Sequence, residues 1–208
     1  MTEYCIPTAP SETELTEKRS RFIGRVWPVE SEEEARALIE ATKKKHYDAR
    51  HNCWCYRLRG GVERYSDDGE PQGTAGQPML GVFQKEEVTN VVCVVTRYFG
   101  GVLLGAGGLV RAYTQSAKDA LDAAGRSVVR RWVDVEVPCP YHLFERVKLE
   151  TENAGGVLGE VEYGAQVLLH ALLPEARAED FIARIVELTA GGITPAAVGE
   201  AFKAVPLK

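Results

Sequence analysis

Two glycine-rich segments on either side of an apolar stretch constrain this chain more than any other feature. The first covers residues 65–78 (YSDDGEPQGTAGQP), and the second covers residues 96–113 (TRYFGGVLLGAGGLVRAY). Backbone this poor in side chains loses much conformational entropy on folding, so each segment needs a structural or a functional reason.

The second segment joins a predicted strand at residues 91–95 to a predicted helix. The apolar positions after residue 108 have helical spacing, and Gly125 stands where a helix C-cap belongs. A glycine turn leading into a helix leaves unpaired N–H groups and a positive dipole end, which attract anions. The candidate anion- or nucleic-acid-binding residues here are Arg97, Gly100, Gly101, Gly105, Gly107, Gly108 and Arg111, and the same set includes His51, Arg57 and Thr74 elsewhere in the chain. The spacing matches neither the dinucleotide fingerprint nor the Walker A loop. The alternative is that these glycines only let the helix pack closely on a sheet.

The first segment carries three carboxyl groups, Asp67, Asp68 and Glu70, within one predicted turn. Such a group can hold magnesium, which favours a few carboxylates with waters and phosphate oxygens. It is equally compatible with an ordinary solvated turn, because Asp-Gly and Glu-Pro are common turn pairs. Thr74 is predicted to N-cap a short helix over residues 78–83.

Residues 51–57 (HNCWCYR) alternate as a strand, with His51, Cys53 and Cys55 on one face. Residues i and i+4 of a strand lie about 13 Å apart, too far to share one zinc ion. We therefore expect no metal site here, buried cysteines by default, and a His51 that either orients the acidic loop or satisfies a core hydrogen bond. The basic residues that could face RNA are Lys43, Lys44, Lys45, Arg50, Arg57 and Arg59. The three lysines also suit a helix C-terminus for local reasons.

The remaining patterns predict an α+β chain of two domains. Strands are expected at residues 3–7 and 20–29, and Ser31 with Glu34 forms a capping box at the start of a helix. After residue 131 the order is strand, helix, strand, strand, helix, strand, at residues 132–137, 141–154, 157–163, 166–173, 175–188 and 202–205. This βαββαβ order is ferredoxin-like.

Charge supports the same division, into residues 1–131 and 132–208. The second part contains 6 Lys and Arg against 12 Asp and Glu, whereas the first contains 19 against 18. An acidic C-terminal part repels nucleic acid, so RNA contacts would come from the N-terminal part. No apolar run is long enough to span a membrane and five cysteines are an odd number, so we expect a cytosolic protein with reduced thiols.

The chain resembles the IMPACT/YigZ family across nearly its whole length. The resemblance rests on SDDGEPxGTAGxP at residues 66–78, VTRYFGG at 95–101, LGAGGLVRAY at 104–113, KxSRFIG at 18–24, and HNC and YR at 51–53 and 56–57. It implies an N-terminal α+β sandwich like domain two of the fifth small-subunit ribosomal protein. It also implies a ferredoxin-like C-terminal domain similar to a ribosome-binding domain of elongation factor G. Relatives often have lysines where this chain has Gln77 and Leu103, which weakens the positive field here.

The family resemblance also implies a role around translation and the starvation response, although fold transfers better than function. The leading hypothesis is a non-catalytic regulator that binds RNA, the ribosome or a translation-regulatory protein through the glycine-rich cleft. A second is a magnesium-dependent enzyme acting on a phosphorylated small molecule, for which no nucleophile and base pair is evident. A third is a protein-interaction module whose glycines are purely architectural. The oligomeric state is not predicted.

Overall fold

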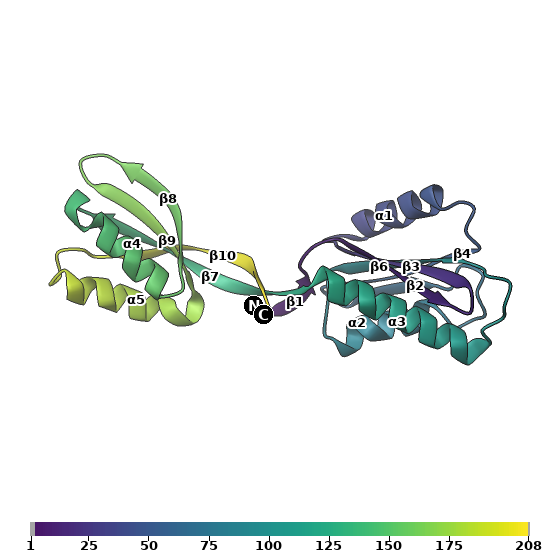
Figure 1. Cartoon of the computed structure of the whole chain (residues 1–208). Coiled ribbons are helices and arrows are strands. Elements are labelled where there is room, and N and C mark those ends of the chain that lie inside the picture. Colours follow the sequence, from purple (N-terminus) through teal and green to yellow (C-terminus); the bar gives the residue numbers. More distant parts are fainter. Residues whose placement is uncertain (1–2, 208) are drawn as a thin grey trace. The chain divides into compact units, whose positions relative to one another are not determined.

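The computed structural model describes residues 3–207, which divide into two compact units. One contains Tyr4–Val128 and residues 204–207, and the other contains residue 3 and Val129–Lys203. Strand β7 (Arg126–Cys139) begins in the first and ends in the second, so the predicted boundary at residue 131 lies inside a continuous strand. The fold is α+β, as predicted, with two antiparallel sheets (Figure 1).

The N-terminal unit is a five-stranded sheet in the order β2-β3-β6-β4-β5, covered by helices on both faces. Its elements are β1 (Tyr4–Pro7), β2 (Ser11–Glu17), β3 (Ser20–Pro28), α1 (Glu32–Lys45), β4 (His51–Leu58), β5 (Val62–Ser66), α2 (Gly76–Lys85), β6 (Val91–Tyr98) and α3 (Ala106–Ala124). Strands β2 and β5 were not predicted. Both are edge strands, and their polar sequences, SETELTE and VERYS, lack an apolar face that would mark a strand.

Helix α1 covers one face of this sheet, and α2 and α3 cover the other (Figure 1). The Ser31 capping box is confirmed in part, because Ser31 Oγ accepts from the Glu34 amide while Glu34 accepts from the Glu30 amide. Strand β6 is buried from Val91 to Arg97, since it lies between two covered faces. The predicted alternation of β4 is confirmed, since Cys53 and Cys55 pack toward α2 and α3, while Tyr56 packs toward α1.

Close helix-to-sheet packing comes from a strand residue. A Cβ added to Gly24 of β3 would lie 2.5 Å from the Ser116 carbonyl oxygen of α3. In contrast, a Cβ at Gly107 would meet nothing nearer than the Arg111 side chain at 3.6 Å. The glycine that α3 packs against is therefore in the sheet, and the first turn of α3 is free of that packing.

The C-terminal unit follows the predicted βαββαβ order. After β7 come a 3-10 turn (Tyr141–Leu143), α4 (Phe144–Asn153), β8 (Val157–Tyr163), β9 (Val167–Pro174), α5 (Glu175–Leu188) and β10 (Ala196–Pro206). Strand β7 pairs with β9 and β10, and β9 pairs with β8, which is the ferredoxin-like arrangement. Helices α4 and α5 pack through Val147, Phe181 and Ile185 into one core with β7 and β9.

Candidate functional site

A cavity of about 440 Å³ lies where β6 ends and α3 begins, and both glycine-rich segments line it. Gly69, Glu70 and Pro71 form one wall, and residues 103–106 form another. Strand β4 contributes its first residue, His51, because His51 and Arg97 are direct neighbours in the β4–β6 register. The two segments that are most glycine-rich in the sequence therefore meet at a single hollow.

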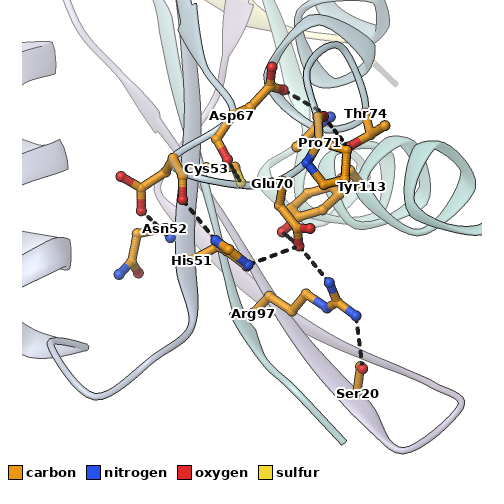
Figure 2. Close-up of polar contacts among 12 residues, drawn as sticks. Ser20, His51, Asn52, Cys53, Asp67, Glu70, Pro71, Thr74, Arg97 and Tyr113 are labelled. Carbon is orange, nitrogen blue, oxygen red and sulfur yellow. Dashed lines mark hydrogen bonds and ion pairs between the residues drawn. The ribbon is translucent and has the colours of Figure 1, made fainter. Parts of the chain in front are cut away.

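Arg97 and Glu70 form a buried ion pair on the cavity wall. Arg97 Nη1 donates to Glu70 Oε1 at 2.6 Å, and the two side chains are 6% and 3% exposed (Figure 2). Arg97 Nη2 donates to Ser20 Oγ at 3.3 Å, and the guanidinium lies 5.4 Å from the Phe22 ring centroid and 5.6 Å from that of Phe99. Because the Arg97 charge is neutralised in the protein, this residue organises the cavity more than it attracts an anion.

Two protonated groups complete the environment of the acidic loop (Figure 2). The Tyr113 hydroxyl, from α3, donates to Glu70 Oε1 at 2.8 Å, and the Cys53 thiol donates to the Asp67 carbonyl oxygen at 3.0 Å. Burial raises the pKa of the Tyr113 hydroxyl and the pKa of the Cys53 thiol, each far above its ordinary value. Both groups therefore remain neutral donors at physiological pH.

His51 has one fixed and one open ring nitrogen. Nδ1 donates to the Asp68 carbonyl oxygen at 2.8 Å, because a carbonyl can only accept. The other nitrogen, Nε2, lies 3.8 Å from Glu70 Oε1, beyond hydrogen-bonding distance (Figure 2). In the neutral ring, Nε2 is therefore an acceptor on the cavity wall. Of the two expected roles, His51 takes the one in which it orients the acidic loop.

Asp67 provides the cap that was predicted for Thr74, and the Thr74 prediction is wrong. Helix α2 has no side-chain cap from its N-cap residue, Ala75, and the Thr74 hydroxyl donates instead to the Pro71 carbonyl oxygen. Asp67 Oδ1 accepts from the amides of Ala75 and Gly76, and Oδ2 accepts from Gly73. A carboxylate reaching from a preceding turn satisfies the same amides as a local cap and suits the helix dipole better.

The acidic loop does not fit magnesium. Asp67 is occupied by three amides, and Asp68 accepts from the Asn52 amide at 2.7 Å and pairs with Lys43 at 3.1 Å. Glu70 is held by Arg97 and Tyr113. Magnesium needs carboxylate oxygens around one point, whereas these three groups are held apart by protein donors. Among residues 3–207, no three His, Cys, Asp or Glu side chains are gathered as a metal site would require.

The start of α3 presents unpaired amides to the cavity. Its N-cap, Gly105, has φ of 73°, a left-handed conformation that suits glycine. The first amide to find a partner in the helix is that of Leu109, and the first turn carries no acidic residue. Arg50 lines the same cavity, is exposed, and has no carboxylate partner in the described part of the chain. Backbone amides and Arg50 are thus the donors here that remain free for an anion.

Arg111 and Arg57 lie away from this cavity. Arg111 lines a second hollow of about 450 Å³ with Lys18, and Leu104 contributes to both hollows. Arg57 pairs with Glu63 at 2.8 Å and donates to the carbonyl oxygens of residues 83 and 88, so it joins strands to the α2 region. Arg97 and Arg111 therefore do not converge on one cleft, although both flank the start of α3.

Three residues of the site had no role in the sequence-based hypothesis: Tyr113, Ser20 and Phe99. Tyr113 was assigned only to the apolar stripe of α3, which it also occupies. Ser20 Oγ accepts from both Arg97 and the Gly100 amide, and its place in the KxSRFIG string at residues 18–24 was its available signal. Phe99 stands two residues after Arg97 in the VTRYFGG string, and this position was its available signal in the sequence. In the structure its side chain is 47% exposed.

A polar network lies behind the cavity, on the α1 side of the sheet. Buried Arg25 donates to Glu12, to Thr96 and to His46 Nε2. His46 Nδ1 contacts the Tyr98 hydroxyl at 2.9 Å. Burial, followed by the positive charge of Arg25, lowers the pKa of His46 from its ordinary value of 6.5. Neutral His46 therefore accepts from Arg25 and donates to Tyr98.

Comparisons with known proteins match both units. The Impact N-terminal domain matches residues 18–121, and a domain of unknown function, DUF1949, matches residues 137–191. IMPACT family member YigZ of Escherichia coli K12 is 34% identical over 96% of this chain and 100% of its own length. YvyE of Bacillus subtilis 168 is 36% identical over 86% of this chain and 84% of its own. A crystal structure of a hypothetical protein aligns with a TM-score of 0.60 at 33% identity, covering 96% of this chain and 98% of that one.

The fold and the cavity define a two-unit α+β protein that carries a hollow of about 440 Å³ in its N-terminal unit. Across residues 3–207, no helix is long and apolar enough to cross a bilayer. The chain belongs to the IMPACT family, because the Impact N-terminal domain matches residues 18–121, YigZ matches over its full length, and the signature segments line the hollow.

Proposed function

We propose that this protein is a non-catalytic, translation-associated regulator that binds single-stranded RNA, free or on the ribosome, through the rim of the cavity at the start of α3. The observation that carries the proposal is a set of four exposed cations around that helix start: Lys18, Arg19, Arg50 and Arg111. Within residues 3–207, none of the four has a carboxylate partner, so their charges are available to phosphates. The link to translation rests on membership of the IMPACT family.

The local geometry also supports a flexible, charged ligand. A Cβ at Gly100 would lie 2.0 Å from the backbone of Arg19, so the loop after β6 lies directly against the turn that carries Lys18 and Arg19. Phe99 and Leu103, at the rim, are 47% and 82% exposed. An exposed ring beside free cations suits an unpaired base and its phosphate. Catalysis is not part of the proposal, because Glu70 and Asp67 are committed to protein partners.

Fluorescence anisotropy with a labelled single-stranded RNA of mixed sequence, between 50 and 200 mM salt, tests the proposal. Four phosphate contacts give a log–log salt slope of about −3, at about 0.7 per contact. Arg111→Gln should weaken binding and reduce the slope by about 0.7. Lys85→Gln, at the C-terminal end of α2, is the matched control. It should change neither the affinity nor the salt slope. Absent or salt-independent RNA binding contradicts the proposal and favours a protein partner.

A further inference from the structure

The inference rests on the proposed function and begins with one oxygen of Glu70. The Glu70 side chain is 3% exposed, and its close contacts converge on Oε1, with Arg97 Nη1 at 2.6 Å and the Tyr113 hydroxyl at 2.8 Å. Oε2 accepts no hydrogen bond from residues 3–207. Oε2 is not fully buried, and Glu70 lines the cavity. An unpaired carboxylate oxygen on a side chain this buried is a ready acceptor for a ligand donor.

The protein supplies no donor on that side of the cavity. His51 Nε2 lies 3.8 Å from Glu70 Oε1, the oxygen that Arg97 and Tyr113 already hold, and no side chain of residues 3–207 donates to Oε2. The unpaired oxygen Oε2 therefore calls for a ligand group that brings its own hydrogen. A phosphate cannot meet this need, since it is itself an acceptor and is repelled by the carboxylate.

The α3 side of the same cavity has the opposite chemistry. The amides of residues 106–108 have no acceptor in the described chain, and Arg50 stands beside them without a carboxylate partner. The cavity therefore offers donors for an anion at one wall and an acceptor for a hydroxyl, Glu70 Oε2, at another. A ribonucleotide unit carries both groups, a phosphate and a ribose 2′-hydroxyl, on one small frame.

We propose that the cavity holds one nucleotide of the bound RNA, with a phosphate at the start of α3 and the ribose 2′-hydroxyl donating to Glu70 Oε2. The cavity then discriminates RNA from DNA, because the 2′-hydroxyl is the group that DNA lacks. A hydrogen bond to a charged acceptor corresponds to a preference of about tenfold or more. Glu70 is thus the residue that sets specificity, and Arg97 and Tyr113 position it.

The experiment compares three oligonucleotides of one sequence by anisotropy: RNA, DNA and 2′-O-methyl RNA. The methylated strand keeps the RNA sugar conformation and replaces the hydroxyl hydrogen with a methyl group, so its 2′-oxygen cannot donate. The wild-type chain should bind RNA about tenfold more tightly than either of the others. Equal affinity for all three overturns this inference and leaves RNA binding standing. Failure of all three to bind overturns the proposed function as well.

Glu70→Gln provides the second arm. Arg97 and Tyr113 are both donors, so the amide oxygen must face them, and the NH₂ group replaces Oε2 in the cavity. The preference for RNA over 2′-O-methyl RNA should disappear. Ala106→Asp, at the exposed start of α3, should weaken all three strands and leave their ratio unchanged. A Glu70→Gln protein that is folded by circular dichroism and retains the full preference contradicts the assignment, and the wild-type comparison decides it even if the variant does not fold.

Discussion

Glu70 and Arg97 lie 27 residues apart in the sequence and share a 2.6 Å ion pair that is almost closed to solvent. The pair ties the acidic loop after β5 to the end of β6, the two segments between which the cavity forms. Removing one partner of such a pair leaves an uncompensated buried charge.

We therefore expect Arg97→Ala to lower the free energy of unfolding by about 3 kcal/mol or more. Differential scanning calorimetry of the full chain measures the change. Arg36→Ala, which removes an exposed pair with Glu32, is the control and should leave the transition where it is. An Arg97→Ala protein as stable as the wild type would mean that the pair does not hold the cavity together.

Asp67→Ala should lower the free energy of unfolding by about 2 kcal/mol, because three amides at the start of α2 lose a charged acceptor. Urea unfolding measures this effect. Gln72→Ala, in the same loop and exposed, should be neutral. Added magnesium should stabilise neither protein, and a magnesium-dependent shift in the wild-type midpoint would show that the loop binds the ion after all.

Gly100→Ala should destabilise the protein by about 2 kcal/mol or more, because the new Cβ would lie 2.0 Å from the carbonyl group of Arg19. Gly81→Ala is the matched substitution, since Gly81 lies within α2 and a Cβ there meets nothing within 4 Å. It should stabilise the protein by about 0.5–1 kcal/mol through helix propensity. If both substitutions change the free energy of unfolding in the same direction, the close approach of the loop to the β2–β3 turn is not rigid.

Stability should fall as the pH drops below about 6.5, because the pKa of His46 is lowered in the folded protein. The unfolded chain then binds a proton that the folded chain does not, so the free energy of unfolding decreases as the pH falls. Above pH 6.5 both states are neutral at this residue and the contribution vanishes. His46→Gln should flatten the dependence between pH 7 and 5.5 in urea titrations. An unchanged slope in the variant would assign the effect to another group.

Local patterns in the sequence predicted much of the fold. Gly125 ends α3, Ser31 begins α1, and the alternation in β4 assigns each face correctly, because caps and strand periodicity depend on neighbouring residues. The edge strand β2 was missed since its outward face is charged and its inward face is only partly covered. The N-cap of α2 was missed because its acceptor, Asp67, comes from outside the helix.

Some residues named from the sequence line the cavity, among them Arg97, Glu70 and His51, but their partnerships were not predicted. Arg97 was expected to face an anion and Glu70 a cation, and the structure pairs the two with each other. Their meeting depends on how β4 and β6 are aligned and on Tyr113 reaching across from α3, and neither relationship leaves a local signal. Charge type can be read from the sequence, whereas neutralisation of one charge by another is a property of the folded chain.

Residues 204–207 return to the N-terminal unit, where the Leu207 amide donates to the Arg126 carbonyl oxygen at 2.8 Å. A fragment cut after residue 131 would consequently keep the first half of β7 and lose the polypeptide that closes its edge. Exposed backbone of this kind invites self-association. Work on the isolated Impact N-terminal domain should therefore fuse residues 204–207 to it through a short linker. Aggregation of the fragment is then not mistaken for a natural oligomer.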